Sequence, residues 1–228
     1  MAYKKEQWML GDNPDPSKYE DIHTNAGWYR RKKRARGSNI NAIFKKNAAN
    51  LPHTLAAADY ILSRLEPWLR GLELWTLRMK LSGALLKSIN QTNKAGFKFM
   101  KGLDIQPYRK MQSLLHAKYS TILKKNKIII TIELGAKTID LHNSIATDFY
   151  FDAVILWGDP VKQKLKIESA ESLVYPIENT PNEKCEIKLN LPENNNPWIL
   201  FLKVSCIEGN EYARSSRHYA MKVIQTSE

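Results

Sequence analysis

A dense run of cations follows two aromatic residues near the amino terminus. Residues 27–37 are Gly27-Trp28-Tyr29-Arg30-Arg31-Lys32-Lys33-Arg34-Ala35-Arg36-Gly37, so six cations occupy the seven positions 30–36. Cations at this density repel one another and gain nothing from burial, so they are tolerated in water and useful when an anion faces them. The run therefore predicts contact with an anionic partner.

The residue types in this run suit phosphate groups. Arginine presents a planar fork of donors that matches two phosphate oxygens, and lysine adds a compact charge. Neutralising phosphates releases condensed counterions, which is the main source of sequence-independent affinity for nucleic acid. Aromatic residues beside the cations can stack on unpaired bases. The predicted nucleic-acid-binding residues are Trp28, Tyr29, Arg30, Arg31, Lys32, Lys33, Arg34 and Arg36.

Other partners fit the same run of cations. The run could contact an acidic surface on another protein or on a second copy of this chain, and an anionic membrane is a further possible surface. A solvated tail without a specific partner is the plainest interpretation. The sequence does not distinguish DNA from RNA.

The charge is distributed unevenly along the 228 residues. Residues 1–125 hold 24 Lys and Arg against 9 Asp and Glu, whereas residues 126–228 hold 11 against 14. The first part therefore carries a formal charge of +15 and the second a charge of −3. A field of one sign over one part of a chain draws polyanions and bears on partners rather than on fold.

Motifs for catalysis, cofactors or metals are not found in the sequence. There is no GxxxxGK[ST] loop to hold phosphates, no GxGxxG turn and no HExxH, and the five histidines stand far apart. The sequence predicts a protein that is not an enzyme, with no cofactor, no metal site and no small-molecule substrate.

The two cysteines, Cys185 and Cys206, are too few for a disulfide framework and are predicted to be buried, reduced thiols. The amino terminus lacks the apolar core of a signal peptide, and no apolar run is long enough to span a bilayer. A cytoplasmic protein is expected.

The elements expected before residue 126 are an irregular arm and then helices. Residues 1–26 contain a cluster of turn formers and two close prolines, which predict extended chain. Helices are predicted at 42–46, at 55–65 with Thr54 as the cap, at 68–89 and at 106–125. In the third helix Trp68 and Trp75 belong to an apolar stripe and are expected in the core. Cations of the fourth helix either face solvent or extend the basic surface.

From residue 127 the apolar period changes to two, which is typical of strands. Strands are predicted at 128–134, 149–157, 165–167, 173–177, 185–191, 198–207 and 219–225, separated by turn-forming residues. This density of short strands is what an immunoglobulin-like sandwich requires. The predicted fold class is α+β, with a helical, basic amino-terminal half followed by an immunoglobulin-like antiparallel β-sandwich. The predicted domains are an extended basic arm at 1–50, a helical region at 51–125 and the sandwich at 126–228.

The layout resembles an uncharacterised family of Bacteroidetes proteins with a basic amino-terminal motif, helices and a β-sandwich-like carboxyl-terminal part. The matching segments are Trp28-Tyr29-Arg30-Arg31, Lys101-Gly102-Leu103-Asp104-Ile105, and Ile207-Glu208-Gly209-Asn210 with Ser215, Ser216 and Tyr219. The basic run is denser than the family pattern, and the middle motif lacks aromatics at Leu103 and Ile105. The resemblance implies a fold and a bacterial or bacteriophage setting, and it implies no activity.

The function expected from the sequence is non-enzymatic contact with nucleic acid through the basic arm, with the sandwich presenting a second surface to another protein. The alternative is a structural or assembly protein, such as a component of a phage particle or a secretion-type assembly, whose arm docks on a neighbouring subunit.

Overall fold

The computed structural model describes residues 19–24, 27–32, 40–69, 74–106, 108–141, 145–193, 196–208, 211–212 and 218–227. The chain divides into two compact units, Met1–Asn47 and Ala48–Glu228. The described part of the first unit contains strands β1 (Tyr19–Thr24) and β2 (Gly27–Lys32) and the start of helix α1 (Ile40–Leu65). The predicted boundary near Asn126 instead falls in the turn between two paired strands.

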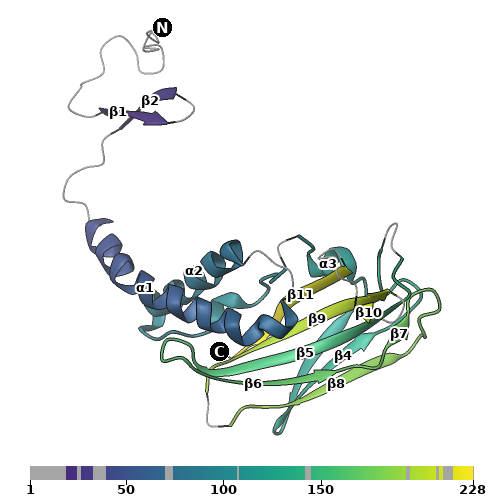
Figure 1. Cartoon of the computed structure of the whole chain (residues 1–228). Helices are drawn as coiled ribbons and strands as arrows, with labels where there is room; N and C mark the ends of the chain where they lie inside the picture. Colours follow the sequence, from purple (N-terminus) through teal and green to yellow (C-terminus); the bar gives the residue numbers. More distant parts are fainter. Residues whose placement is uncertain are drawn as a thin grey trace. The chain divides into compact units, whose positions relative to one another are not determined.

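The second unit has three layers: helices, a large sheet and a small sheet (Figure 1). Its helical elements after α1 are η2 (Glu66–Trp68), α2 (Trp75–Thr92), η3 (Lys98–Met100) and α3 (Met111–Leu114). Its strands are β3 (Tyr119–Lys124), β4 (Lys127–Glu133), β5 (Asp148–Asp159), β6 (Lys164–Glu171), β7 (Tyr175–Pro176), β8 (Lys184–Asn190), β9 (Trp198–Glu208), β10 (Glu211–Tyr212) and β11 (Tyr219–Thr226). The α+β class predicted from the sequence is confirmed, while the immunoglobulin-like topology stays a prediction.

The two sheets are antiparallel and pack face to face. In the large sheet β5 and β9 are central, with β11 and β10 beside β9 and with β6 and β7 beside β5; the small sheet has the order β3-β4-β8. Ile128, Ile130 and Ile132 of β4 bury their side chains against Phe151 and Leu202 of the large sheet. Each fully buried side chain of this size contributes about 1.5 to 3 kcal/mol.

The other face of the large sheet is covered by α1, α2 and η3 (Figure 1). Ile61 and Leu65 of α1 and Leu81 of α2 pack with Phe201 and Val154 of the sheet. Because helices cover one face and the small sheet covers the other, β5 and β9 are buried along most of their length. The segment 102–105 lies along β11, where Gly102 and Ile105 donate backbone hydrogen bonds to the carbonyls of Val223 and Met221.

The helices differ from the prediction in their limits and in the face that they bury. Helix α1 begins at residue 40, so Thr54 is not a cap; its hydroxyl lies inside the helix, 2.9 Å from Ser82 Oγ of α2. The apolar stripe expected for α2 ran through Trp75, Met79 and Ser82 and was widened by Leu77, Leu81 and Leu85. The three leucines and Ser82 are buried, whereas Trp75 and Met79 are exposed. Trp75 is 66% exposed, with Arg78 stacked 5.5 Å from its ring centre.

The predicted helix at 106–125 is wrong. Among the described residues of this range α3 alone is helical, and residues 119–124 form β3, which pairs with β4 in the register Tyr119↔Ile132 to Lys124↔Lys127. The apolar spacing fits either period, and pairing with the isoleucines of β4 gives the strand a buried partner that an isolated helix turn lacks. Six of the seven strands predicted after residue 127 are confirmed in position, while the one predicted at 173–177 is reduced to the two-residue β7 and the short β10 was not predicted.

The predicted extended arm is also partly wrong. Within residues 1–50, β1 and β2 form a hairpin and residues 40–50 belong to α1. Residues 1–18 and 33–39 lie outside the described part of the chain.

Candidate nucleic-acid interface

Strands β1 and β2 form a two-stranded antiparallel ribbon, which we call the amino-terminal ribbon. Six residues of each strand pair, from Tyr19↔Lys32 to Thr24↔Gly27, and neither strand pairs with any other strand in the described part of the chain. Gly27 has a φ of 116°, a conformation that side chains with a Cβ rarely adopt. Glycine at the start of β2 therefore suits the entry into the second strand.

The register of the ribbon places carboxylates opposite cations. Asp21 lies opposite Arg30 and Glu20 lies opposite Arg31, whereas Lys32 lies opposite the neutral Tyr19. Opposite charges at facing positions of an antiparallel pair stabilise it by about 0.2 to 1 kcal/mol each. Arg30 and Arg31 are therefore the two cations of β2 that the register places opposite carboxylates.

Five of the eight predicted site residues lie on β2, namely Trp28, Tyr29, Arg30, Arg31 and Lys32. Lys33, Arg34 and Arg36 lie outside the described residues. Because Trp28 and Tyr29 occupy consecutive positions of a strand, they belong to opposite faces of the ribbon.

The cations predicted on a helix at 106–125 do not form one basic face. Arg109 is structural, because its guanidinium donates hydrogen bonds of 2.8 Å to the carbonyls of Ser113 and Asp140. Lys124 and Lys125 lie instead at the turn between β3 and β4. Sequence analysis missed this turn as a separate cationic site, since it assigned these lysines to a helix.

The large sheet contains a buried pair of opposite charges. Asp152 of β5 is 2% exposed and lies opposite Lys203 of β9, with 3.8 Å between Oδ2 and Nζ. The ammonium of Lys203 also lies 5.1 Å from the ring centre of Tyr219. Burial raises the pKa of Asp152 to about 6; Lys203 lowers this pKa, and neighbouring Glu171 raises it. The cost of desolvating the carboxylate thus exceeds the attraction of the lysine.

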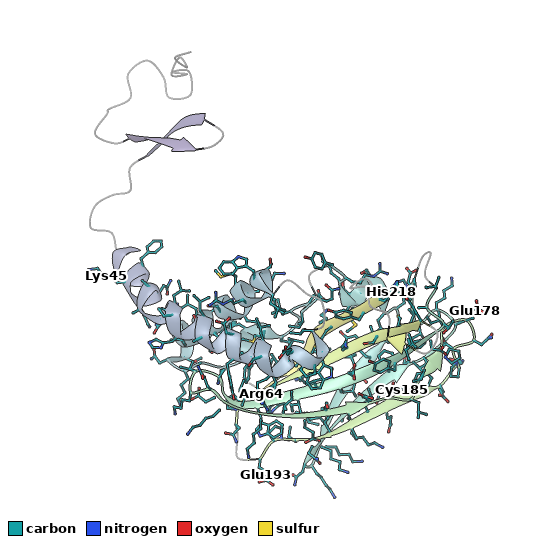
Figure 2. The ribbon with its side chains drawn as sticks, viewed as in Figure 1. Lys45, Arg64, Glu178, Cys185, Glu193 and His218 are labelled. Carbon is teal, nitrogen blue, oxygen red and sulfur yellow. The ribbon has the colours of Figure 1, made fainter. Side chains whose placement is uncertain are left out.

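A second pair lies where β9 ends and β11 begins. Nδ1 of His218 and Oε1 of Glu208 are 2.5 Å apart, and Figure 2 shows His218 beside this end of the sheet. In the part of the chain that the structure describes, no group of three or more His, Cys, Asp or Glu could hold a metal ion. The two pairs described above, Asp152 with Lys203 and Glu208 with His218, each join a carboxylate to one cationic or titratable partner, as structural ion pairs do.

Both cysteines are buried and free, as predicted. Cys185 lies on β8 (Figure 2) and Cys206 on β9, in the core between the two sheets. Burial raises the pKa of the Cys206 thiol to about 12 and also raises the pKa of Cys185. Both thiols are therefore protonated and unreactive at neutral pH.

None of the described helices is long and apolar enough to cross a lipid bilayer.

Comparison with known proteins gives no family. No protein-family model and no curated protein matches the chain. A solved structure described by the words "CC2D1B coordinates ESRCT-III activity during the mitotic reformation of the nuclear envelope" is 10% identical, with 85% of this chain and 76% of that chain covered. The TM-score is 0.25, so this likeness carries no argument about fold or function.

Proposed function

We propose that the protein contacts nucleic acid without catalysing a reaction, and that the amino-terminal ribbon and the cations that follow it make the contact. The observation that carries this proposal is the ribbon itself: two strands pair only with each other among the described strands, and the second contains the first three cations of the run, Arg30, Arg31 and Lys32. The major groove of B-DNA admits a two-stranded β-ribbon. The basic run would then follow the phosphates beside the groove.

The register of the ribbon helps to assign which cations contact the phosphates. Because Arg30 and Arg31 face Asp21 and Glu20, the phosphate contacts are assigned mainly to Lys32, Lys33, Arg34 and Arg36. Arginines supply bidentate contacts and lysines supply point charges. The binding is expected to be largely independent of sequence.

We place the protein in the cytoplasm of a bacterium or a bacteriophage-infected cell. The two reduced, buried thiols agree with a reducing compartment. The sandwich is proposed to present a second surface to another protein.

The test is binding of short fluorescent duplex and single-stranded oligonucleotides, followed by anisotropy across a salt series. The intact chain is compared with a variant in which the six cations from Arg30 to Arg36 are changed to Ser. The matched control changes six exposed lysines of the second unit to Ser: Lys94, Lys98, Lys101, Lys162, Lys164 and Lys166.

The intact protein is expected to bind, with log K falling against log salt at about −0.9 per neutralised phosphate on duplex DNA. The six-cation variant should lose most of this affinity and most of the slope, and the control should retain both. Equal binding by the intact protein and the six-cation variant, or no binding by the intact protein at low salt, would show that the proposal is wrong.

An assembly role is the second candidate, and the open edges of the amino-terminal ribbon favour it. A two-stranded ribbon has unpaired backbone groups along both outer edges, and such edges can add to a sheet of a neighbouring subunit. Light scattering across a concentration series tests this role. A defined oligomer that dissociates when the six cations become Ser would support a phage-particle or secretion-type assembly component.

A further inference from the structure

The turn between β3 and β4 is a second cationic site, which we call the lysine turn, with residues 122–127. All six residues are exposed, and three are lysines: Lys124, Lys125 and Lys127. An open concavity beside the turn is lined by these lysines together with Asn126 and Ile129. The turn thus presents three positive charges within four positions to solvent.

The charges of the lysine turn oppose the fold rather than support it. Lys124 lies directly opposite Lys127 in the register of the hairpin, and like charges at facing positions destabilise a strand pair. Lys125 has a φ of 52°, in the left-handed region where glycine or asparagine is favoured. Local features that cost stability cluster at functional sites, where they are part of the mechanism.

These lysines have no anionic partner in the described part of the chain. No ion pair or side-chain hydrogen bond joins Lys124, Lys125 or Lys127 to a described residue, although other lysines of this unit, such as Lys188 with Glu186 at 3.1 Å, do form ion pairs. Glu193 lies at the same end of the small sheet (Figure 2), where Leu191 donates a backbone hydrogen bond of 2.8 Å to Asn126 of the turn, and among the described residues no ion pair joins Glu193 to these lysines. The charges are therefore available to an external anion.

Apolar side chains flank the lysines on both faces of the hairpin. Ile122 is 55% exposed and Leu123 is 50% exposed. As consecutive strand residues, they point to opposite faces. The cations lie at the extreme end of the hairpin and the aliphatic residues lie behind them. This order does not fit insertion into a bilayer, because the charges would enter before the apolar residues.

We propose that the lysine turn is a second contact with the sugar–phosphate backbone of nucleic acid, separate from the amino-terminal ribbon. The lysine ammonium groups bind phosphate oxygens, and an anion at the turn relieves the repulsion between Lys124 and Lys127. Ile122, which lies opposite Ile129 of the concavity in the register, contacts the apolar parts of the sugars. Lysine point charges carry no base-specific readout, so this contact adds affinity without sequence preference. This inference rests on the proposed function.

The experiment uses the full chain and the same anisotropy assay. The test variant combines Lys124→Ser, Lys125→Gly and Lys127→Ser, in which glycine suits the left-handed position and protects the fold. The matched control changes three exposed lysines of the β5–β6 hairpin, Lys162, Lys164 and Lys166, to Ser. Thermal unfolding of each variant verifies that it is folded.

The test variant is expected to bind duplex DNA with a salt slope that is less steep by about 2.7, which is about 0.9 for each of three lost phosphate contacts. The control triple variant should retain the slope of the intact protein. A Lys125→Gly variant alone should show about one third of that change in the salt slope, and it should remain fully folded.

The outcomes separate this inference from the proposed function. If the six-cation variant loses binding while the lysine-turn variant keeps the full slope, only the inference about the turn is overturned. If the intact protein binds no nucleic acid, both are overturned. If poly-glutamate at equal charge concentration displaces the DNA from the intact protein but not from the lysine-turn variant, the turn recognises an acidic peptide and the inference is overturned.

Discussion

The β5–β6 hairpin and the β3–β4 hairpin are both rich in lysine, but only the β5–β6 hairpin places a carboxylate beside a lysine. In the β5–β6 turn Asp159 accepts hydrogen bonds from the backbone amides of Val161 and Lys162, and its carboxylate lies 3.5 Å from Lys162 Nζ. In the lysine turn a lysine faces a lysine, and another lysine occupies a left-handed position.

The difference shows which lysines the fold itself uses. In β5 both buried and exposed carboxylates have lysine partners, Asp152 with Lys203 and Asp159 with Lys162. The lysines of the β3–β4 turn have no such partner among the described residues. The lysines that pair with carboxylates stabilise the fold, which accounts for their presence. The lysines of the lysine turn destabilise it, which is expected of residues that bind a partner outside the chain.

The largest expected effect concerns Asp152, the buried carboxylate of β5 that pairs with Lys203 of β9. The pKa of Asp152 is raised from 3.8 to about 6 in the folded protein, so the folded state holds an extra proton between these pH values. This stabilising contribution is complete below pH 3.8 and is lost as the pH rises through about 6. Asp152→Asn removes it.

The free energy of unfolding of the intact protein, minus that of Asp152→Asn, should therefore fall by about 3 kcal/mol between pH 3.5 and pH 7.5. Urea unfolding at several pH values measures this difference. Glu178→Gln, which changes an exposed carboxylate, is the control. A difference that rises with pH over this range would contradict the account.

The next effect is expected at the start of the β5–β6 turn. Gly158 has a φ of 120°, and a Cβ on it would lie 2.1 Å from the carbonyl oxygen of Lys164. Gly158→Ala should lower the free energy of unfolding by at least about 2 kcal/mol, because both the backbone conformation and the contact are unfavourable.

The matched control for Gly158→Ala is Gly83→Ala on α2, where an added Cβ meets no atom within 4 Å. This substitution should stabilise the protein by about 0.5 to 1 kcal/mol, since alanine is the better helix former. Equal changes in the free energy of unfolding for Gly158→Ala and Gly83→Ala would show that the turn does not require glycine at position 158.

A smaller effect of opposite sign is expected in the lysine turn. Lys125→Gly should raise the free energy of unfolding by up to about 1 kcal/mol, since glycine adopts the left-handed conformation without the steric cost. Gln163→Gly in the β5–β6 turn, where φ is 54°, is the control for the backbone alone. Differential scanning calorimetry compares both with the intact protein. A loss of stability on Lys125→Gly would remove the evidence for strain at the turn.

The smallest effect tests the facing lysines. Lys124→Glu converts Lys124↔Lys127 into a pair of opposite charges and should stabilise the protein by a few tenths of a kcal/mol at low salt. The gain should disappear in 1 M salt because both residues are exposed. Lys166→Glu, opposite Trp157 in the β5–β6 hairpin, should show no such salt-sensitive gain.

The sequence predicted the strands better than the helices. Alternation along β4 is visible because one face is buried and the other is exposed, so the period of two survives. In residues 119–124 the same apolar residues fit a helix, and only pairing with β4 decides the conformation. Helix α2 has two adjacent rows of apolar residues, and the sequence does not show which one is buried. The row that contains Leu81 is buried because it packs against the large sheet.

The candidate site was predicted in part. The basic run is plain in the sequence, but its pairing with Glu20 and Asp21 depends on the register of the ribbon. Asp152 is buried because helices cover the second face of the large sheet. The lysine turn was not predicted, because its residues were assigned to a helix at 106–125. These features depend on tertiary pairing, which local spacing does not specify.

The contact of both sites with nucleic acid is tested by the rate of acetylation of each lysine in the intact protein, followed by mass spectrometry with and without a duplex oligonucleotide. We expect the duplex to slow modification of Lys32 and Lys33 in the basic run and of Lys124, Lys125 and Lys127 in the lysine turn. Lys162, Lys164 and Lys166 should react at the same rate in both conditions. Unchanged rates at the run and at the turn, under conditions where the oligonucleotide is bound, would contradict the account.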